Sequence, residues 1–216
     1  MLTSTETRWI LNSSEVEVVE KWFKNYDQSF LEQSRFPRKD YYLKTNSNNL
    51  GIKIREPKFD NQGKCIAKLE LKSLLEDKGP HKFNNSNTGI INSWNKYSFD
   101  LDKETNPIKT ITNTVTTSIY EDWLLIEKDR LLVKYNSLSK NIVSGKDIIN
   151  SGAGIELTKF KFNNEIFFSL GIEAFAESDS SEKVFFETIE FFFNSCQLSG
   201  LEHHNSKTYP EILQND

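Results

Sequence analysis

The chain has 216 residues, of which 37% are hydrophobic, 27% charged and 12% aromatic, with 9 Gly and 5 Pro. This composition is typical of a globular protein and excludes collagen, a coiled coil and low-complexity disorder. There are 27 Lys and Arg residues against 31 Asp and Glu residues, so the net charge of -4 gives no overall attraction to DNA or to acidic lipid.

The two cysteines, Cys65 and Cys196, lie far apart and have no metal-ligand spacing around them. This argues against a disulfide-stabilised secreted domain and against structural zinc. The first twelve residues lack the pattern of a signal peptide, and no stretch approaches the ~18 apolar residues that span a bilayer. We therefore expect a cytoplasmic protein with no DNA partner and no membrane partner, and the sequence leaves a homodimer open.

Helical and extended patterns alternate along the chain. An extended segment over 3–11 comes first, and apolar residues at helical spacing then predict an amphipathic helix over 15–33, with Ser14 and Glu17 as its capping box. Short segments of alternating polarity predict strands, and these are 40–45, 50–57, 65–75, 90–101, 123–135, 154–162 and 166–177. We expect a loop over 79–88, a Thr-rich extended segment over 110–117 and a tight turn at Asn163-Asn164.

A second helix follows the strands. Asp179 and Glu182 predict its start, it runs to Cys196, and a short last helix is expected over 210–214. The chain shows no internal repeat and no flexible linker. The pattern predicts a single α+β domain over 1–216, an eight-stranded antiparallel β-barrel with flanking helices.

Several predicted strands carry charge on one face, because residues i and i+2 of a strand point to the same side. For any one strand, a solvated outer face is the simpler interpretation. The sum over the strands favours another interpretation, since these faces gather seven basic and four acidic residues, an excess of three positive charges in an acidic chain. The residues are Arg8, Lys53, Arg55, Lys68, Lys72, Lys128, Arg130, Glu6, Glu70, Glu156 and Glu173.

If the aromatic-rich helices cover the apolar outer face of a barrel, these charged faces must point inward. A hydrated lumen would accommodate them. Basic residues with carboxylates between them are typical of an anion-binding site that also holds a cation. The sequence thus predicts an anion-binding site in the lumen of the barrel.

Eight stretches in order resemble the CYTH-like superfamily, the triphosphate tunnel metalloenzymes. They are Glu6-Thr7-Arg8-Trp9-Ile10, Asp40-Tyr41-Tyr42-Leu43, 50–56, Leu69-Glu70-Leu71-Lys72, Glu127-Lys128-Asp129-Arg130, 154–158, Gly171-Ile172-Glu173 and 206–213. The resemblance covers about 210 residues and implies an eight-stranded tunnel that binds triphosphate with Mg²⁺ or Mn²⁺.

The resemblance also implies roles for individual residues. Phosphate is expected to bind Arg8, Lys53, Arg55, Lys72, Lys128 and Arg130. The metal-ligand candidates are Glu6, Glu156 and Glu173, and Glu6 and Glu173 are also the candidate catalytic residues. Arg offers forked donors to phosphate oxygens, and a hard divalent cation prefers carboxylate oxygen.

The chain departs from the family pattern at Ser4, which stands where the first Glu of the E-x-E-x-K strand is expected, and at Arg8, which replaces Lys. An alternative register would place that motif at Glu15-Val16-Glu17, where the capping pattern instead favours a helix. The first hypothesis is a metal-dependent phosphohydrolase acting on inorganic or organic triphosphates. The alternatives are a non-catalytic phosphate or polyphosphate binder, which Ser4 favours, and an adenylate-cyclase-type reaction on ATP.

Overall fold

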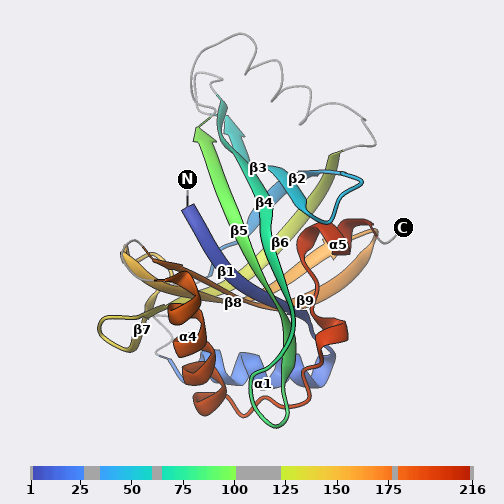
Figure 1. The fold of residues 1–216 in the computed structure, drawn as a ribbon. Coiled ribbons are helices and arrows are strands. Elements are labelled where there is room, and N and C mark those ends of the chain that lie inside the picture. Colours follow the sequence, from blue (N-terminus) through green and yellow to red (C-terminus); the bar gives the residue numbers. More distant parts are fainter. Residues whose placement is uncertain (1, 27–34, 60–64, 101–122, 177–179, 215–216) are drawn as a thin grey trace.

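Nine antiparallel strands make up one sheet in the part of the chain that the computed structural model describes, which is residues 2–26, 35–59, 65–100, 123–176 and 180–214 (Figure 1). The strands are β1 (Leu2–Ile10), β2 (Arg38–Leu43), β3 (Leu50–Phe59), β4 (Cys65–Lys82), β5 (Thr88–Asp100), β6 (Trp123–Asn136), β7 (Asn141–Ser144), β8 (Ser151–Phe162) and β9 (Glu165–Ala176). The helices are α1 (Ser13–Lys24), α4 (Ser181–Ser195), the 3₁₀ turn His203–Asn205 and α5 (Tyr209–Gln214).

The sheet closes on itself. Its order is β2-β3-β4-β5-β1-β9-β8-β6-β7, and an additional pairing of β2 with β6 completes an eight-stranded barrel that leaves β7 outside. At the closing seam, Arg38 lies opposite Lys128 and Tyr42 lies opposite Leu124. The predicted α+β fold with an eight-stranded antiparallel barrel is confirmed.

The turn between β8 and β9 shows how local sequence fixes the register of a hairpin. Asn163 and Asn164 both have positive φ angles, 47° and 63°, a conformation that Asn tolerates better than most residues. The strands on either side pair without a break from Phe162 opposite Glu165 to Ser151 opposite Ala176. The tight turn predicted at these two residues is confirmed.

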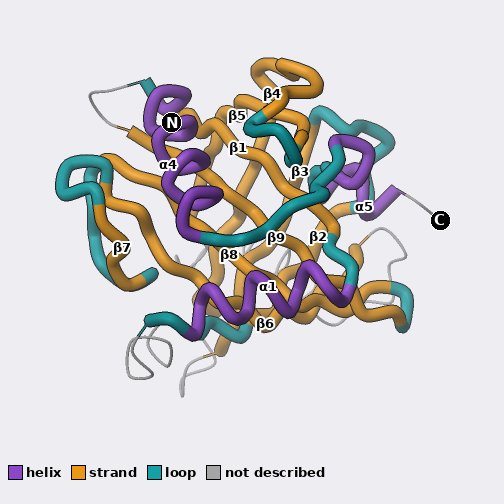
Figure 2. The backbone as a smooth tube through the Cα atoms, turned by 90° about the horizontal axis from the view of Figure 1, so that it is seen from below, coloured by secondary structure: helices purple, strands orange, loops and turns teal. Residues whose placement is uncertain are grey.

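Two helices cover the apolar outer face of the barrel. Helix α4 packs against β9, β1 and β8, and the indole of Trp22 in α1 donates a hydrogen bond to Ser195 at the end of α4 at 2.9 Å. Aromatic side chains from both helices join the largest core cluster, including Trp22, Phe23, Phe185 and Phe192. Figure 2 shows α1, α4 and the segment that leads from α4 to α5 lying across one side of the strands. The outer face is therefore unavailable to the charged residues, as the sequence predicted.

The start of α1 differs from the prediction. The helix begins at Ser13, and its capping box is formed by Asn12 and Glu15 rather than by Ser14 and Glu17. The Asn12 side chain accepts from the Glu15 amide at 3.0 Å, and the Glu15 carboxylate accepts from the Asn12 amide at 2.8 Å. Because 13–24 is helical, the alternative family register at Glu15-Val16-Glu17 is excluded. The predicted helix residues from 27 onward lie outside the described part of the chain.

Strand β4 is longer than predicted and takes up the first four residues, 79–82, of the loop expected over 79–88. It continues to Lys82 because a register shift between Asp77 and Pro80 absorbs the Gly-Pro pair, and Gly79 adopts a φ of 70° there. Strand β7 was not predicted. The segment 110–117 and the cap residue Asp179 lie outside the described residues, and Ser180 is the N-cap of α4.

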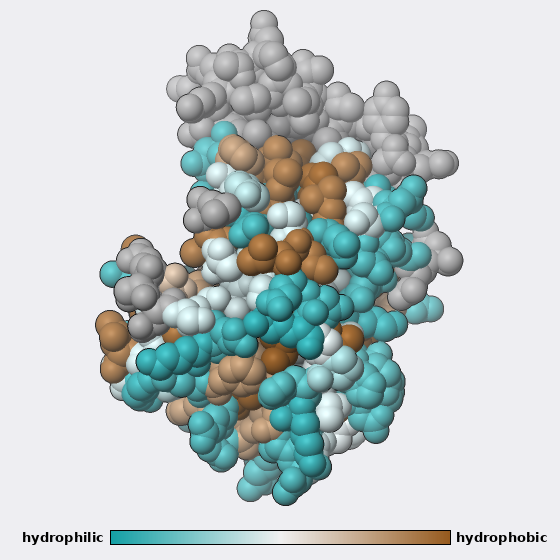
Figure 3. Space-filling model, in the orientation of Figure 1, coloured by the Kyte–Doolittle hydropathy of each residue, from teal (hydrophilic) through white to brown (hydrophobic). Residues whose placement is uncertain are grey.

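The outer surface is mixed in polarity. Figure 3 shows apolar side chains over the upper strands and mostly hydrophilic ones below them. Exposed large apolar residues include Leu75, Phe99 and Leu125. Across the described residues, no helix combines the length and the hydrophobicity needed to cross a membrane.

Candidate anion-binding lumen

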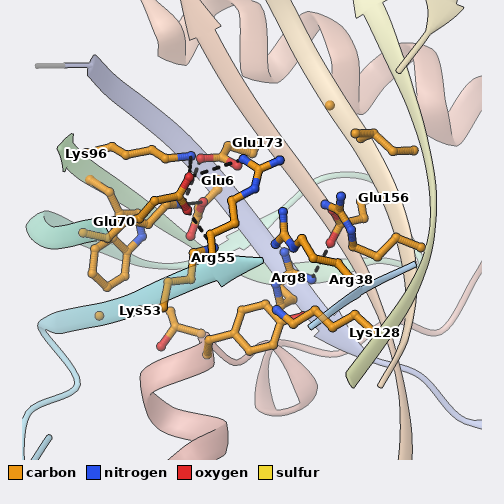
Figure 4. A pocket seen from close by; sticks show the side chains of 18 of the residues that line it. Glu6, Arg8, Arg38, Lys53, Arg55, Glu70, Lys96, Lys128, Glu156 and Glu173 are labelled. Atoms are coloured by element: carbon orange, nitrogen blue, oxygen red, sulfur yellow. Dashed lines mark hydrogen bonds and ion pairs between the residues drawn. The ribbon is translucent and has the colours of Figure 1, made fainter. Parts of the chain in front are cut away.

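A cavity of about 480 Å³ lies inside the barrel, and charged side chains from β1, β2, β3, β4, β5, β6, β8 and β9 line it (Figure 4). Of the described residues that line it, nine are basic and four are acidic, which leaves an excess of five positive charges. They are Arg8, Arg38, Lys53, Arg55, Lys72, Lys96, Lys128, Arg130, Lys134, Glu6, Glu70, Glu156 and Glu173. The whole chain is acidic, so this concentration of positive charge is local to the lumen.

All the residues that the sequence analysis singled out for the site line this one cavity. They are Glu6, Arg8, Lys53, Arg55, Lys72, Lys128, Arg130, Glu156 and Glu173. Lys68, which shares a strand face with Lys72, does not line it and pairs instead with Asp100 at 3.0 Å, where both side chains are more than half exposed. Alternation along a strand therefore identified the correct face, and the ends of that face extend past the lumen.

Glu6 and Glu173 meet on neighbouring strands and share one ammonium group. They lie directly opposite each other on β1 and β9, and Lys72 Nζ lies 2.5 Å from Glu6 Oε2 and 2.8 Å from Glu173 Oε1. Burial opposes the charges here, but their mutual attraction outweighs it: the pKa of Lys72 is raised and that of Glu173 is lowered to about 2. We call Glu6, Glu173 and Lys72 the carboxylate cluster.

A second group of charges surrounds Glu70. Its carboxylate lies 2.9 Å from Lys53 Nζ, 3.3 Å from Arg55 Nη1 and 3.8 Å from Lys96 Nζ. Burial opposes ionisation of Glu70, but the three surrounding cations outweigh it and hold its pKa well below the usual range. Although Glu173 stabilises the charge of Lys96, burial and the neighbouring ammonium groups hold the pKa of Lys96 below its usual value.

Glu156 lies between two arginines. Arg130 Nη1 donates to Glu156 Oε2 at 2.7 Å, Arg8 Nη1 lies 3.6 Å from Oε1, and the Thr158 hydroxyl donates to Oε1 at 2.6 Å. Burial disfavours the carboxylate charge, but the two guanidinium groups outweigh it and hold the pKa of Glu156 far below its usual value. We call Arg8, Arg130 and Glu156 the guanidinium cluster.

A glycine makes room for Arg8. Gly171 lies opposite Arg8 in the β1–β9 pairing, and a Cβ atom at Gly171 would lie 2.7 Å from Arg8 Nη2. The guanidinium therefore lies flat on the backbone of β9, where its Nη1 also donates to Ser169 at 2.9 Å. Any larger residue at 171 would displace it.

Lys128 is the most deeply buried ammonium of the site and has aromatic neighbours. It donates to the Tyr42 hydroxyl at 2.8 Å, lies 3.6 Å from the centroid of the Tyr209 ring and 3.6 Å from Asp40 Oδ2. Burial lowers the pKa of Lys128 to about 8, although Tyr42 and Asp40 counteract the shift. This ammonium therefore changes protonation state near neutral pH.

Sequence reasoning missed Arg38, Asp40, Lys96 and the two tyrosines. Arg38 pairs with the fully buried Asp40 at 2.8 Å, and alternation within β2 places both on the face of Tyr42. The signal was present in the pattern Arg-x-Asp-x-Tyr, but the predicted strand began at residue 40, close after Pro37. Lys96 likewise lies two residues beyond Trp94, on a predicted strand for which no charged face was predicted.

Two of the three predicted metal ligands fit a hard cation. Glu6 and Glu173 are adjacent and already share a positively charged group, and Mg²⁺ in proteins often uses only one or two carboxylates together with substrate phosphates. Glu156 lies apart from them, with both oxygens engaged by arginine and threonine (Figure 4). The described residues contain no group of three or more Asp, Glu, His or Cys side chains suited to a metal ion.

No protein-family model and no curated protein matches the sequence. Similar solved structures include a proposed adenylate cyclase from Bacillus halodurans, which is 10% identical over 94% of this chain and 95% of that chain with a TM-score of 0.46. They also include an RNA triphosphatase from S. pombe, which is 13% identical over 89% of this chain and 82% of that chain with a TM-score of 0.37.

The chain's own features carry the assignment of the fold. Eight antiparallel strands close into a barrel, and the residues that resemble family motifs point into its lumen. The closed eight-stranded antiparallel barrel is the fold that the resemblance to the CYTH-like superfamily implied, and that expectation of the fold is confirmed.

Proposed function

We propose that the protein binds a triphosphate inside the barrel and hydrolyses its terminal phosphoanhydride bond with the help of a divalent cation. The observation that supports this most directly is the excess of five positive charges among the described residues that line one cavity inside the barrel. A triphosphate carries about four negative charges at neutral pH, so the lumen matches it in charge. The cavity of about 480 Å³ is in the range of small-molecule sites.

The basic residues are spread along the lumen, which suits a ligand with several phosphates. Arg8 and Arg38 offer forked donors on one side, and Lys53, Arg55 and Lys96 surround Glu70 on the other (Figure 4). Arg130 adds a third guanidinium beside Arg8, since both pair with Glu156. One arginine can donate to two phosphate oxygens at once, and a lysine provides a point charge. The two sets would bind different phosphates of one chain and fix its orientation.

The same groups would lower the barrier to hydrolysis. Charge develops on the transferred phosphoryl group, and the fixed lysine and arginine groups of the lumen would neutralise it. Glu6 and Glu173 would hold the divalent cation, whose role when bound is to neutralise phosphate charge and polarise the phosphoryl oxygens. The same carboxylates are the candidates for orienting the attacking water.

Release of orthophosphate from tripolyphosphate, nucleoside triphosphates and thiamine triphosphate, with Mg²⁺ or Mn²⁺, tests the proposal. We expect turnover of at least one of them and a loss of about 100-fold or more in kcat/KM for Arg130→Ala. Lys68→Ala is the matched control, because Lys68 lies on a strand face of the barrel but outside the lumen, and it should retain activity. Absence of turnover over the whole panel would overturn the proposal.

A non-catalytic binder is the second candidate, and the carboxylates favour it. Ser4 is fully buried where the family pattern places an acid, and the remaining pair, Glu6 and Glu173, is already occupied by the ammonium of Lys72. Such a binder would show a rise in melting temperature with tripolyphosphate in the presence of EDTA and no orthophosphate. A cyclic nucleotide formed from ATP would instead indicate a cyclase.

A further inference from the structure

Lys72 occupies the position in which a cation must lie to bind Glu6 and Glu173 together. It reaches them from β4, which is two strands away from β1 in the sheet. Its Nζ lies 2.5 Å and 2.8 Å from one oxygen of each carboxylate. Without a cation between them, two carboxylates on directly opposite residues of antiparallel strands would repel each other. The ammonium therefore stabilises the pair in the absence of ligand.

A divalent cation that binds the same two carboxylate oxygens would compete with this ammonium. Mg²⁺ would bind the carboxylate oxygens at about 2.1 Å, which would put it within about 5 Å of Lys72 Nζ. Two cations at that distance inside a partly buried lumen repel strongly. A metal ion can enter only when Lys72 leaves.

Among the described residues of the lumen, no carboxylate other than Glu6 and Glu173 is available to pair with Lys72. Among the acidic side chains that the structure describes in and next to the lumen, Glu70 has three cationic neighbours and Glu156 has two. Asp40 also has three, at 2.8, 3.6 and 3.9 Å. A cation that left Glu6 and Glu173 would be desolvated without a partner, unless a ligand brought new anionic oxygens into the lumen.

We propose that Lys72 closes the Glu6–Glu173 pair to divalent cations until a triphosphate binds and offers the ammonium another acceptor. The idea rests on the proposed ligand and adds an order of events: the triphosphate binds first and the divalent cation second. Because coupling between two binding events is reciprocal, each ligand must also raise the affinity for the other. Lys72 is the two-position element that couples them.

Mn²⁺ binding, measured by electron paramagnetic resonance with no triphosphate present, tests the proposal in the intact chain. We expect the wild type to leave Mn²⁺ free and Lys72→Met to bind one Mn²⁺ at least about tenfold more tightly. Adding Glu6→Gln to Lys72→Met should abolish this binding. Lys128→Met is the matched control, because it removes one positive charge from the same lumen, leaves Lys72 in place and should gain no affinity.

A second measurement uses the wild type alone, in case Lys72→Met does not fold. With non-hydrolysable imidotriphosphate, Mn²⁺ should enhance water-proton relaxation more in the presence of the protein than the free Mn²⁺–imidotriphosphate complex does. Tight Mn²⁺ binding by the wild type without triphosphate, or no enhancement with it, would overturn the proposal. Neither measurement needs turnover, so enhancement without orthophosphate release would refute only the hydrolase.

Discussion

The carboxylate cluster and the guanidinium cluster combine the same kinds of charge in opposite ratios. In the first, two carboxylates share the single ammonium of Lys72; in the second, the single carboxylate Glu156 lies between Arg8 and Arg130. The first group therefore has a net negative charge and attracts a cation, and the second has a net positive charge and attracts an anion. One lumen thus contains two groups of opposite net charge, which is the arrangement that the proposed metal-bound phosphate would need.

The comparison also shows which charges are structural. Glu156 lies between two guanidinium groups and offsets their mutual repulsion, whereas the two carboxylates of the first cluster share one ammonium. We therefore expect Glu156 to contribute mainly to stability and the Glu6–Glu173 pair to contribute mainly to the proposed binding of a cation. Substitutions in and next to the guanidinium cluster separate these two roles, because they change stability and phosphate affinity by different amounts.

Glu156→Gln should produce the largest effect, a loss of about 3 kcal/mol in the free energy of unfolding, because it leaves two buried guanidinium groups without their counterion. Urea denaturation at pH 7 measures it. The control Glu127→Gln removes a carboxylate of the exposed pair with Lys39 on the same barrel and should leave the midpoint unchanged. Equal stability of wild type and Glu156→Gln would show that the guanidinium cluster is solvated and independent of its carboxylate.

Gly171→Ala should weaken tripolyphosphate binding by about tenfold, since the new Cβ displaces the Arg8 guanidinium from the backbone of β9. Isothermal titration calorimetry measures the change. Gly51→Ala is the matched control, because a Cβ there would make only ordinary contacts, at 3.6 Å with Pro210 and 3.9 Å with Lys72. Unchanged affinity in Gly171→Ala would remove Arg8 from the set of phosphate ligands.

The smallest effect concerns pH, and it distinguishes Lys128 from the other cations. Its pKa of about 8 lies below that of an ordinary lysine, so the free protein loses this charge as the pH rises through 8. An anion binds the protonated form better, and affinity for tripolyphosphate should therefore fall by about threefold between pH 7.5 and 8.5. Lys128→Arg should bind with no such change over this interval, because arginine stays charged. A wild-type affinity that stays constant over the same interval would contradict the prediction.

Strand alternation predicted the barrel and the inward face, because the position of a side chain on one face of a strand is a local property. It could not predict which charges meet. The sharing of Lys72 by Glu6 and Glu173 depends on the order of β4, β5, β1 and β9 in the sheet, which no single segment encodes. Arg38 was missed for a local reason: because Pro37 directly precedes it, the predicted strand began only at residue 40, whereas β2 begins at Arg38.

The capping of α1 shows a similar limit at smaller scale. Two overlapping patterns, Asn12 with Glu15 and Ser14 with Glu17, both fit a capping box. The structure uses the first, in which Ser14 donates to the Asn12 side chain at 2.7 Å. The prediction of Ser14 with Glu17 was therefore wrong, because both patterns satisfy the local rule and the helix begins at Ser13, two residues earlier than that pattern indicates.

The closing seam of the barrel has a consequence for how the protein folds. It joins β2 to β6 with Arg38 directly opposite Lys128, two like charges whose repulsion is relieved only when Asp40 is in place beside both. Closure of the barrel must therefore overcome the repulsion between these two side chains at the seam of β2 and β6. We expect dissolved multivalent anions that screen this repulsion to speed the refolding of the chain, and refolding rates measured with and without tripolyphosphate would check this.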